Sequence, residues 1–163
     1  MTEPSDGHTY AWRTRNPGRA LSNALRRFEE RVLELMREAG HTEIQRSHVH
    51  LTRHLDIEGT RITELARRAA MTNAAMTELI DLCSARGLVE RVADPADGRV
   101  RIVRFTPAGL AWLDAFGRAV ADAEREMAAV IGPQVLAKLI PALARYGGDA
   151  DSGNPLDGRN GST

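Results

Sequence analysis

Small and short polar residues predominate in the segment that begins at Thr72. Its first seven positions hold two threonines, one asparagine and two alanines, and Glu78 is the only charged residue among them. An exposed helix face ordinarily carries Lys, Glu and Arg, whereas short side chains let a helix approach the edges of DNA bases. An asparagine can form paired hydrogen bonds with adenine, and Thr or Ala methyls can contact thymine. We expect such contacts from Thr72, Asn73, Ala74 and Thr77; the alternative is an ordinary surface helix in an alanine-rich chain.

A hairpin is predicted shortly after this segment. Residues 88–92 and 100–105 alternate apolar and polar side chains in the manner of β-strands. The Asp-Pro-Ala-Asp-Gly sequence at 94–98 lies between them and is rich in turn-forming residues. The two runs and the turn predict a β-wing.

Arginines occupy the positions of this hairpin from which DNA could be reached. Arg99 follows the turn, and a guanidinium at a hairpin tip can enter a narrow minor groove, where the potential is most negative. Asp97 and Gly98 are expected to shape the tip, although they would serve equally well to close an ordinary hairpin. Arg91 and Arg101 flank the loop and could reach phosphates, which would make binding salt-dependent.

Two short helices must position these side chains. Thr63 is a good N-cap for the first of them and is counted among the expected DNA contacts. The turn falls at residues 69–71, Thr72 caps the second helix, and Gly87 ends it. A helix-turn-helix followed by a wing is a unit that places one helix in the major groove and a loop beside it.

Longer helices flank this unit. Apolar residues recur at helical spacing over 19–39, and Gly40 is expected to end that helix. A shorter helix is predicted over 42–55. Thr106 and Pro107 begin a long helix that Gly132-Pro133 breaks, and a last helix follows, with Pro141 expected to kink it. The near-sevenfold spacing of the apolar residues in the long helix favours a helix–helix seam. Residues 1–18 and 147–163 are expected to be disordered.

Composition sets further bounds on function. The chain has 163 residues, and its 22 basic and 22 acidic residues give a net charge of zero, which taken alone argues against nucleic-acid binding. However, residues 19–104 carry 15 arginines against 13 acidic residues, and Lys138 is the one lysine of the chain. No apolar run is long enough to span a bilayer and no secretory signal is visible. A single cysteine, Cys83, fits a reducing cytoplasm, and we interpret it as a small packed hydrophobic residue.

The sequence gives little support for a catalytic site or a metal site. We identify no set of nucleophile, general base and orienting group, and no enzyme activity is expected. His48, His50 and His54 lie close in sequence, and the last two could share a helix face and hold zinc. No carboxylate or cysteine nearby completes a ligand set, so no metal site is expected. A metal-responsive regulator that uses these histidines remains an alternative.

The chain resembles the multiple antibiotic resistance regulator (MarR) family of winged-helix transcription factors. The resemblance rests on Glu64-Leu65-Ala66, the Gly-Leu-Val-Glu-Arg sequence at 87–91, Asp97-Gly98-Arg99 and the Thr-Pro-Ala-Gly sequence at 106–109. It implies a mainly α fold with a small β-wing over residues 19–146. Within it, the DNA-binding lobe would span 42–105, and the dimerisation helices would span 19–39 and 106–146.

The resemblance also implies a mechanism. It points to a bacterial, cytoplasmic homodimer, bound to the nucleoid when active, that represses transcription from a pseudo-palindromic operator. Binding of a small aromatic ligand would weaken DNA binding; no cofactor and no membrane partner are implied. The helix from Thr72 would be the recognition helix and Arg99 the wing-tip residue, and His48, Leu51 and His54 are expected to line the ligand pocket. Gly98 stands where family members commonly have arginine. The main rival interpretation is a winged-helix module that binds protein instead of DNA.

Overall fold

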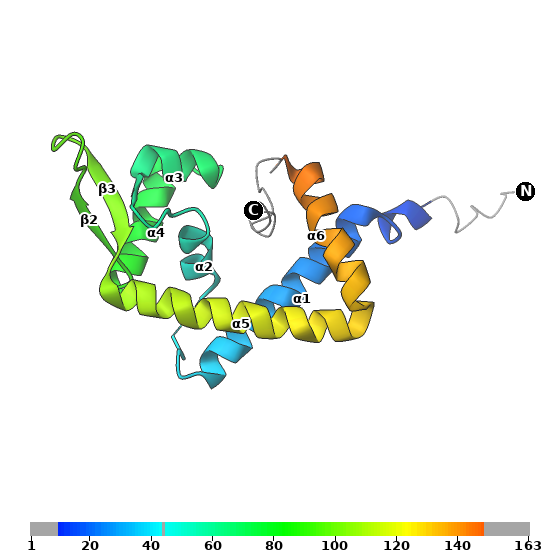
Figure 1. The fold of residues 1–163 in the computed structure, drawn as a ribbon. Coiled ribbons are helices and arrows are strands. Elements are labelled where there is room, and N and C mark those ends of the chain that lie inside the picture. Colours follow the sequence, from blue (N-terminus) through cyan, green and yellow to red (C-terminus); the bar gives the residue numbers. More distant parts are fainter. Residues whose placement is uncertain (1–9, 44, 149–163) are drawn as a thin grey trace, which may run out of the picture. The chain divides into compact units, whose positions relative to one another are not determined.

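The computed structural model describes residues 10–43 and 45–148. These residues form helices and one small three-stranded antiparallel sheet, as the predicted mainly α fold with a β-wing requires (Figure 1). In chain order the elements are the short 3₁₀ helix η1 (Ala11–Arg13), α1 (Pro17–Glu38), α2 (Arg46–Thr52), β1 (Thr60–Arg61), α3 (Ile62–Arg68), α4 (Asn73–Ala85), β2 (Val89–Ala93), β3 (Arg101–Phe105), α5 (Pro107–Ile131) and α6 (Pro133–Gly147).

The chain divides into two compact units, residues 1–123 and residues 124–163. The first unit contains every buried apolar side chain of the described residues. Its core is made by Leu51 of α2, Leu65 of α3, Met76 and Ile80 of α4, and Val103 of β3, all of which are fully buried. Burial of each such side chain contributes about 2 kcal/mol to the free energy of unfolding. Met36 of α1 and Trp112 of α5 extend the same cluster.

The helix-turn-helix forms where the sequence predicts it, with one difference at its start. Thr72 caps α4, because its Oγ1 accepts a hydrogen bond from the backbone N–H of Ala75 at 3.2 Å. The turn before it contains Ala70 in the left-handed region, at φ 51°. Thr63, however, does not cap α3: the helix begins at Ile62, and Arg61 occupies the cap position without a side-chain hydrogen bond. The expected cap is wrong because β1 leads directly into the helix and leaves Thr63 within its first turn.

The wing is the antiparallel pair β2 and β3, in register from Val89 opposite Phe105 to Ala93 opposite Arg101. Both strands lie within one residue of their predicted bounds. The strand β1, which pairs with β3 so that Thr60 lies opposite Val103, was not predicted, because two residues are too few to show an alternation.

Glycine is needed where this strand approaches β3. Gly59 has φ +102°, and a Cβ there would lie 2.9 Å from Ile102 Cδ1 and 3.1 Å from the carbonyl oxygen of Val103. A larger residue would therefore be strained by its backbone conformation and would also collide with β3.

The start of α5 packs tightly against the start of β2. Thr106 Oγ1 accepts a hydrogen bond from the Gly109 N–H at 2.9 Å, and its own hydroxyl donates to the carbonyl of Gly87. The Thr106 N–H donates to the Leu88 carbonyl at 3.1 Å. A Cβ on Gly109 would overlap that same carbonyl group. The segments 87–91 and 106–109 are thus two sides of one contact, which requires glycine at position 109, whereas Gly87 is favoured by its positive φ of 68°.

The helices at the N-terminal side differ from their predicted bounds. Residues 10–18 were expected to be disordered, yet they form η1, the N-cap Asn16 and the first residues of α1. The Asn16 side chain accepts a hydrogen bond from the Arg19 N–H at 2.9 Å, and this cap starts the helix two residues before its predicted start. Helix α2 is shorter than the predicted 42–55. Residues 1–9 and 149–163, which were also expected to be disordered, lie outside the described residues.

The second unit contains the last turns of α5, from Glu124, and α6. Gly132, at φ 91°, separates the two helices as predicted, and Pro141, which was expected to kink the last helix, lies inside α6. Val135, Ile140, Leu143 and Tyr146 of α6 are exposed, and no described residue of α6 is buried. Among the described residues no single helix has the length and apolarity to span a membrane; only the bent pair α5 and α6, taken together, passes that test.

Candidate DNA-binding surface

The N-terminal end of α4 carries side chains that the fold leaves available. Thr72, Asn73 and Ala74 are exposed. Among the described residues no side chain or backbone group forms a hydrogen bond with the Asn73 amide. Thr77 is half-buried, and its hydroxyl donates to the Asn73 carbonyl at 2.8 Å, so it can offer a base only its acceptor side. The amide of Asn73 is therefore the most available hydrogen-bonding group on this surface.

The opposite face of α4 fastens the helix to the core. Met76, Ile80 and Cys83 are fully buried, and Leu79 is nearly so. Burial raises the pKa of the Cys83 thiol to about 12, so this cysteine is a packed side chain and not a reactive thiolate. The separation of the two faces holds the polar end of the helix outward.

The wing tip is shaped by two aspartates. Asp94 Oδ1 accepts the Ala96 N–H at 2.9 Å, and Asp97 Oδ1 accepts the Arg99 N–H at 3.1 Å. These side chains imitate backbone turns, and Asp97 therefore holds the backbone of the loop and not the arginine's guanidinium. Arg99 is exposed, and no described residue pairs with its guanidinium. Gly98 does not have a positive φ, and a Cβ there would meet nothing within 4 Å, so this position does not require glycine.

The arginines of the strands differ in whether a carboxylate of the described residues already pairs with them. Arg91 forms an ion pair with Asp81 at 2.7 Å and donates to the Thr77 carbonyl at 3.4 Å, so it joins β2 to α4. Arg104 pairs with Glu90 across the two strands at 2.8 Å. Arg101 is exposed, and within the described part of the chain its side chain has no partner. Of the two arginines expected to reach phosphates, Arg101 is thus available and Arg91 is held by α4.

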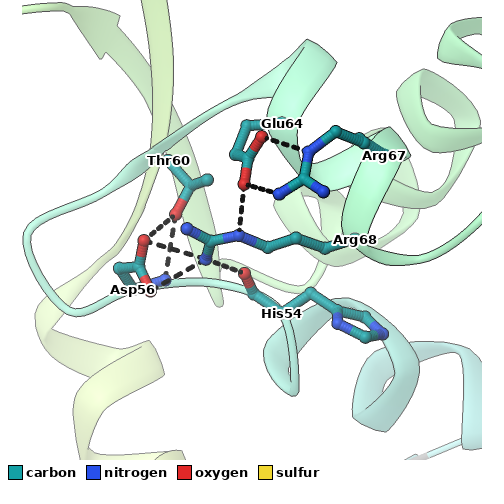
Figure 2. A network of polar contacts seen from close by, with 6 residues as sticks. All are labelled: His54, Asp56, Thr60, Glu64, Arg67 and Arg68. Atoms are coloured by element: carbon teal, nitrogen blue, oxygen red, sulfur yellow. Dashed lines mark hydrogen bonds and ion pairs between the residues drawn. The ribbon is translucent and has the colours of Figure 1, made fainter. Parts of the chain in front are cut away.

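A polar network fixes α3 to the loop that follows α2 (Figure 2). Arg68 donates to the His54 carbonyl at 3.0 Å, to both carboxylate oxygens of Asp56 at 2.9 Å and to Glu64 at 2.8 Å. Thr60 donates to Asp56 at 3.1 Å. The hydrogen bonds from Arg67 and then Arg68 lower the pKa of Glu64 to about 2, and the hydrogen bond from Arg68 lowers the pKa of Asp56. Both carboxylates are therefore charged at neutral pH.

Sequence reasoning missed this network. Asp56 and Arg68 are far apart in sequence, and nothing in their spacing indicates a contact. A second missed contact joins Arg61 of β1 to Asp94, at the start of the wing-tip loop, at 2.9 Å. Thr63, expected as a DNA contact, is exposed in the first turn of α3 and does not take part in either contact.

A cavity of about 600 Å³ lies in the first unit beside the helix-turn-helix. It is lined by α1, by one face of α2, by Met71 in the turn before α4, by Leu79 of α4 and by α5. His50 belongs to its lining, whereas His48, Leu51 and His54, which were expected there, do not. His48 and Leu51 are buried in the core. His48 and Leu51 lie on the face of α2 that enters the core, His50 lies on the face at the cavity, and His54 follows the end of the helix. The sequence could not decide which face the core takes.

The histidines do not gather into a metal site within the described residues. His50 and His54 pack edge to face, with ring centroids 5.5 Å apart. His48 Nδ1 accepts the Gln45 N–H at 3.0 Å, and His48 is thereby part of a capping box at the start of α2. Burial lowers the pKa of His48 and is the first cause of the lowered pKa of His54. Burial thus favours the neutral form of both rings.

The comparisons with known proteins agree with this geometry. The model of the MarR family matches residues 44–100. A probable transcriptional regulator from Pseudomonas aeruginosa is 28% identical, with a TM-score of 0.57 over 77% of this chain and 96% of that one. Wild-type MarR from E. coli shares the fold at 20% identity, with a TM-score of 0.64 over 80% of this chain and 96% of its own. No curated protein sequence matches this chain significantly.

A third relative has been solved with DNA and with a ligand. The transcriptional repressor CouR, bound to a 23-mer DNA duplex, has 24% identity and a TM-score of 0.65 over 85% of this chain and 96% of its own. CouR from Rhodococcus jostii RHA1 bound to p-coumaroyl-CoA has 22% identity and a TM-score of 0.65, over 82% and 92% of the two chains. MarR-family members are transcription regulators and not enzymes. Residues 44–100 thus match the MarR family model, and the described residues share the winged helix-turn-helix fold of MarR from E. coli.

Proposed function

We propose that this chain is a homodimeric repressor that binds a pseudo-palindromic DNA operator and releases it when a small aromatic ligand binds. One observation carries the proposal. The two side chains best suited to read DNA, the Asn73 amide on α4 and the Arg99 guanidinium on the wing, are both exposed and engaged by no other described residue. Polar groups that a fold leaves available on one surface are candidates for recognition of a partner.

On DNA, the N-terminal end of α4 enters the major groove. Asn73 reads a base edge, while Thr72, Ala74 and Thr77 allow close approach. The helix N-terminus adds about 0.5 kcal/mol of attraction towards a phosphate. Arg99 enters the adjacent minor groove, and Arg101 and Thr63 contact the backbone. Arg91 acts differently, because its ion pair with Asp81 holds α4 against the wing. CouR, a repressor of similar fold, has been solved bound to a 23-mer DNA duplex, which supports DNA as the partner of this fold.

Dimerisation supplies the second half-site. The exposed apolar residues Leu25 of α1 and Val135, Ile140 and Leu143 of α6 are suited to contact a second copy, as the predicted dimerisation helices require. In a symmetric dimer the two recognition helices would lie about 34 Å apart, one turn of DNA. Symmetry of the operator then follows from symmetry of the protein.

Ligand response follows from the position of the cavity. Met71 and Leu79 belong to its lining, so a ligand there touches both the turn before the recognition helix and the helix itself. A ligand that binds one arrangement of these elements better than the other shifts the dimer away from its DNA-binding state. CouR, a protein of similar fold, has been solved bound to p-coumaroyl-CoA, which supports ligand binding by this fold.

A gel-shift experiment tests the proposal. The full chain is incubated with the DNA upstream of its own gene and with shuffled DNA of equal length, each at two salt concentrations. We expect retardation of the upstream fragment, and a steep loss of affinity as salt increases, because bound phosphates release counterions. Absence of retardation at low salt would favour the rival role, a protein-binding winged helix.

A further inference from the structure

The wing-tip loop, residues 94–100, is bonded to one side chain among the described residues outside the wing. That side chain is Arg61, which donates from Nε at 3.2 Å and from Nη2 at 2.9 Å to Oδ2 of Asp94. The other carboxylate oxygen of Asp94 accepts the Ala96 N–H at 2.9 Å. The carboxylate is therefore held on one side by Arg61 and on the other by the backbone of the loop.

Asp94 organises the loop with its backbone as well as with its side chain. Its N–H donates to the Val100 carbonyl at 2.8 Å, and its carbonyl accepts the Asp97 N–H at 3.1 Å. Asp97 in turn accepts the Arg99 N–H on its side chain. The Asp94 side chain is 13% exposed and that of Arg61 is 53% exposed, so the carboxylate is mostly covered while the guanidinium lies at the surface. A contact that fixes Asp94 therefore limits where the backbone of Arg99 can lie.

Arg61 also belongs to the helix-turn-helix. It is the last residue of β1, where it lies opposite Ile102 of β3, and it occupies the N-cap position of α3. Its side chain makes no cap hydrogen bond there, although Ser, Thr, Asp or Asn at an N-cap would stabilise the helix. A positive charge at a helix N-terminus is also unfavourable. Helix α3 therefore gains nothing from an arginine at this position, and the polar contact that the side chain makes is the one with Asp94.

We infer that Arg61 is a positioning residue for the wing, which by way of Asp94 holds the tip loop and Arg99 in a fixed place relative to α3 and α4. The inference rests on the proposed function, because that function gives Arg99 a contact with DNA. Arg91 joins the middle of β2 to α4, but the backbone beyond the last β2–β3 pair needs a separate contact. The loop also contains Gly98, and glycine adds backbone freedom. A loop that is fixed before DNA arrives loses less conformational entropy on binding, so binding is tighter.

Arg61→Thr separates positioning of the wing from support of the fold. Threonine removes the contact with Asp94, but its hydroxyl can cap α3. We therefore expect Tm to stay equal or to rise by up to about 4 °C. In the same full-length variant, the NMR order parameters of the Ala96 and Arg99 amides should fall from about 0.85 towards about 0.6.

Arg104→Thr is the matched control for the loss of an arginine from this sheet. Arg104 is 51% exposed and pairs with Glu90 across the two strands, and it has no bond to the tip loop. Its replacement should leave the order parameters of the tip amides unchanged. Loosening of the tip in Arg61→Thr alone would then belong to the contact with Asp94.

Asp94→Asn tests whether Arg61 acts through this carboxylate or contacts a phosphate itself. Asparagine keeps an oxygen for the Ala96 N–H and leaves the Arg61 charge in place, but it removes the ion pair. We expect both single variants to bind operator DNA about three- to tenfold more weakly, because the tip must then be ordered on binding. The salt slope should stay that of the unmodified protein, and the double variant should lose no more affinity than either single one.

The outcomes separate this inference from the proposed function. Tip amides that stay rigid in Arg61→Thr overturn the inference, and so does a Tm that falls together with their order parameters. It is also overturned if Arg61→Thr loses both affinity and salt slope while Asp94→Asn binds as tightly as the unmodified protein, since Arg61 would then contact a phosphate. The NMR measurement needs no DNA. If the tip loosens as expected but the unmodified protein does not retard operator DNA, the role of Arg61 in the wing stands and the proposed function fails.

Discussion

At the scale of single residues, the structure divides the arginines near the wing by what already holds them. Arg99 and Arg101 are exposed and have no partner among the described residues, whereas Arg91 and Arg104 are held by Asp81 and Glu90. An arginine that is already paired gains less from a phosphate, because it must first lose its carboxylate. The two groups should therefore respond differently to mutation.

Arg99→Ala is expected to weaken binding to operator and non-operator DNA alike. Loss of one groove or phosphate contact should also reduce the salt dependence by about one unit of slope. Quantitative gel shifts at several salt concentrations measure both effects. Asn73→Ala is the contrasting variant, since it should alter preference at one base position in each half-site by about 1–3 kcal/mol. An Arg99→Ala protein with unchanged affinity would contradict the assignment of the wing tip.

Arg91→Ala tests whether that arginine positions α4 or contacts a phosphate. We expect a reduced ratio of operator to non-operator affinity with an unchanged salt slope, because the side chain acts through Asp81. Asp81→Ala should produce the same loss, and the double variant should lose no more than either single one. Arg101→Ala, by comparison, should reduce the salt slope. A slope that falls with Arg91→Ala and stays constant with Asp81→Ala would identify Arg91 as a phosphate contact instead.

At the scale of secondary-structure elements, close contacts between segments decide stability. The start of α5 lies against the start of β2, where a side chain at Gly109 would overlap the Leu88 carbonyl. The start of α2 depends on a capping box in which a neutral histidine accepts a hydrogen bond. The contribution of each contact to the free energy of unfolding can be measured with a variant.

Gly109→Ala should destabilise the protein by about 1–3 kcal/mol, because the added methyl group forces α5 away from β2. Gly117→Ala is the control on the same helix. A Cβ at Gly117 meets nothing within 4 Å, so there alanine should stabilise the helix by about 0.5–1 kcal/mol. Urea denaturation of both variants measures the difference. A Gly109→Ala protein as stable as Gly117→Ala would show that the contact between α5 and β2 is looser than described.

His48 should make the stability of the protein pH-dependent. Burial lowers its pKa from the ordinary value of 6.5, so the unfolded chain binds a proton that the folded chain does not. The free energy of unfolding should therefore fall as the pH drops below that value, down to the folded-state pKa. His48→Gln keeps a hydrogen-bond acceptor at a capping-box position that commonly holds glutamine, and it removes the titration. Thermal unfolding across this pH range should show a weaker acid dependence in the variant; an identical dependence would contradict the role of His48.

At the scale of the whole molecule, the proposed function depends on a second copy of the chain. The described residues of α6 include no buried side chain, yet several large apolar ones are exposed along it. Such a helix contributes little to the stability of an isolated chain. Its apolar residues are instead suited to a dimer interface, which an operator with two half-sites requires.

Ile140→Glu should shift the protein from dimer to monomer, because it places a charge among apolar residues at the proposed interface. Light scattering coupled to gel filtration measures the mass, and operator affinity should fall with it. Gln134→Glu adds the same charge at an exposed position of the same helix and should leave the dimer intact. If the Ile140→Glu protein remained a dimer, the interface would have to lie away from this part of α6.

Local signals account for what the sequence determined by itself. The caps at Thr72 and Thr106, the turn at residues 69–71, the hairpin residues 94–98 and the break at Gly132 each depend on a few neighbouring residues. The chain could therefore be assigned a winged helix-turn-helix, and the exposed residues of its candidate DNA-binding surface could be proposed in advance. These features need no knowledge of what lies across the fold, because backbone geometry and adjacent side chains decide them.

Contacts between distant segments decided the rest. Only the tertiary structure showed that β1 pairs with β3, that Arg91 is held by Asp81, and that Arg68 joins Asp56 to Glu64. It also decided which face of α2 enters the core, so that His50 and not His48 lines the cavity. The physical reason is that hydrophobic periodicity specifies that a helix has a buried face, whereas the choice among its faces depends on the shape of the neighbouring elements. Local patterns in the sequence do not specify that shape.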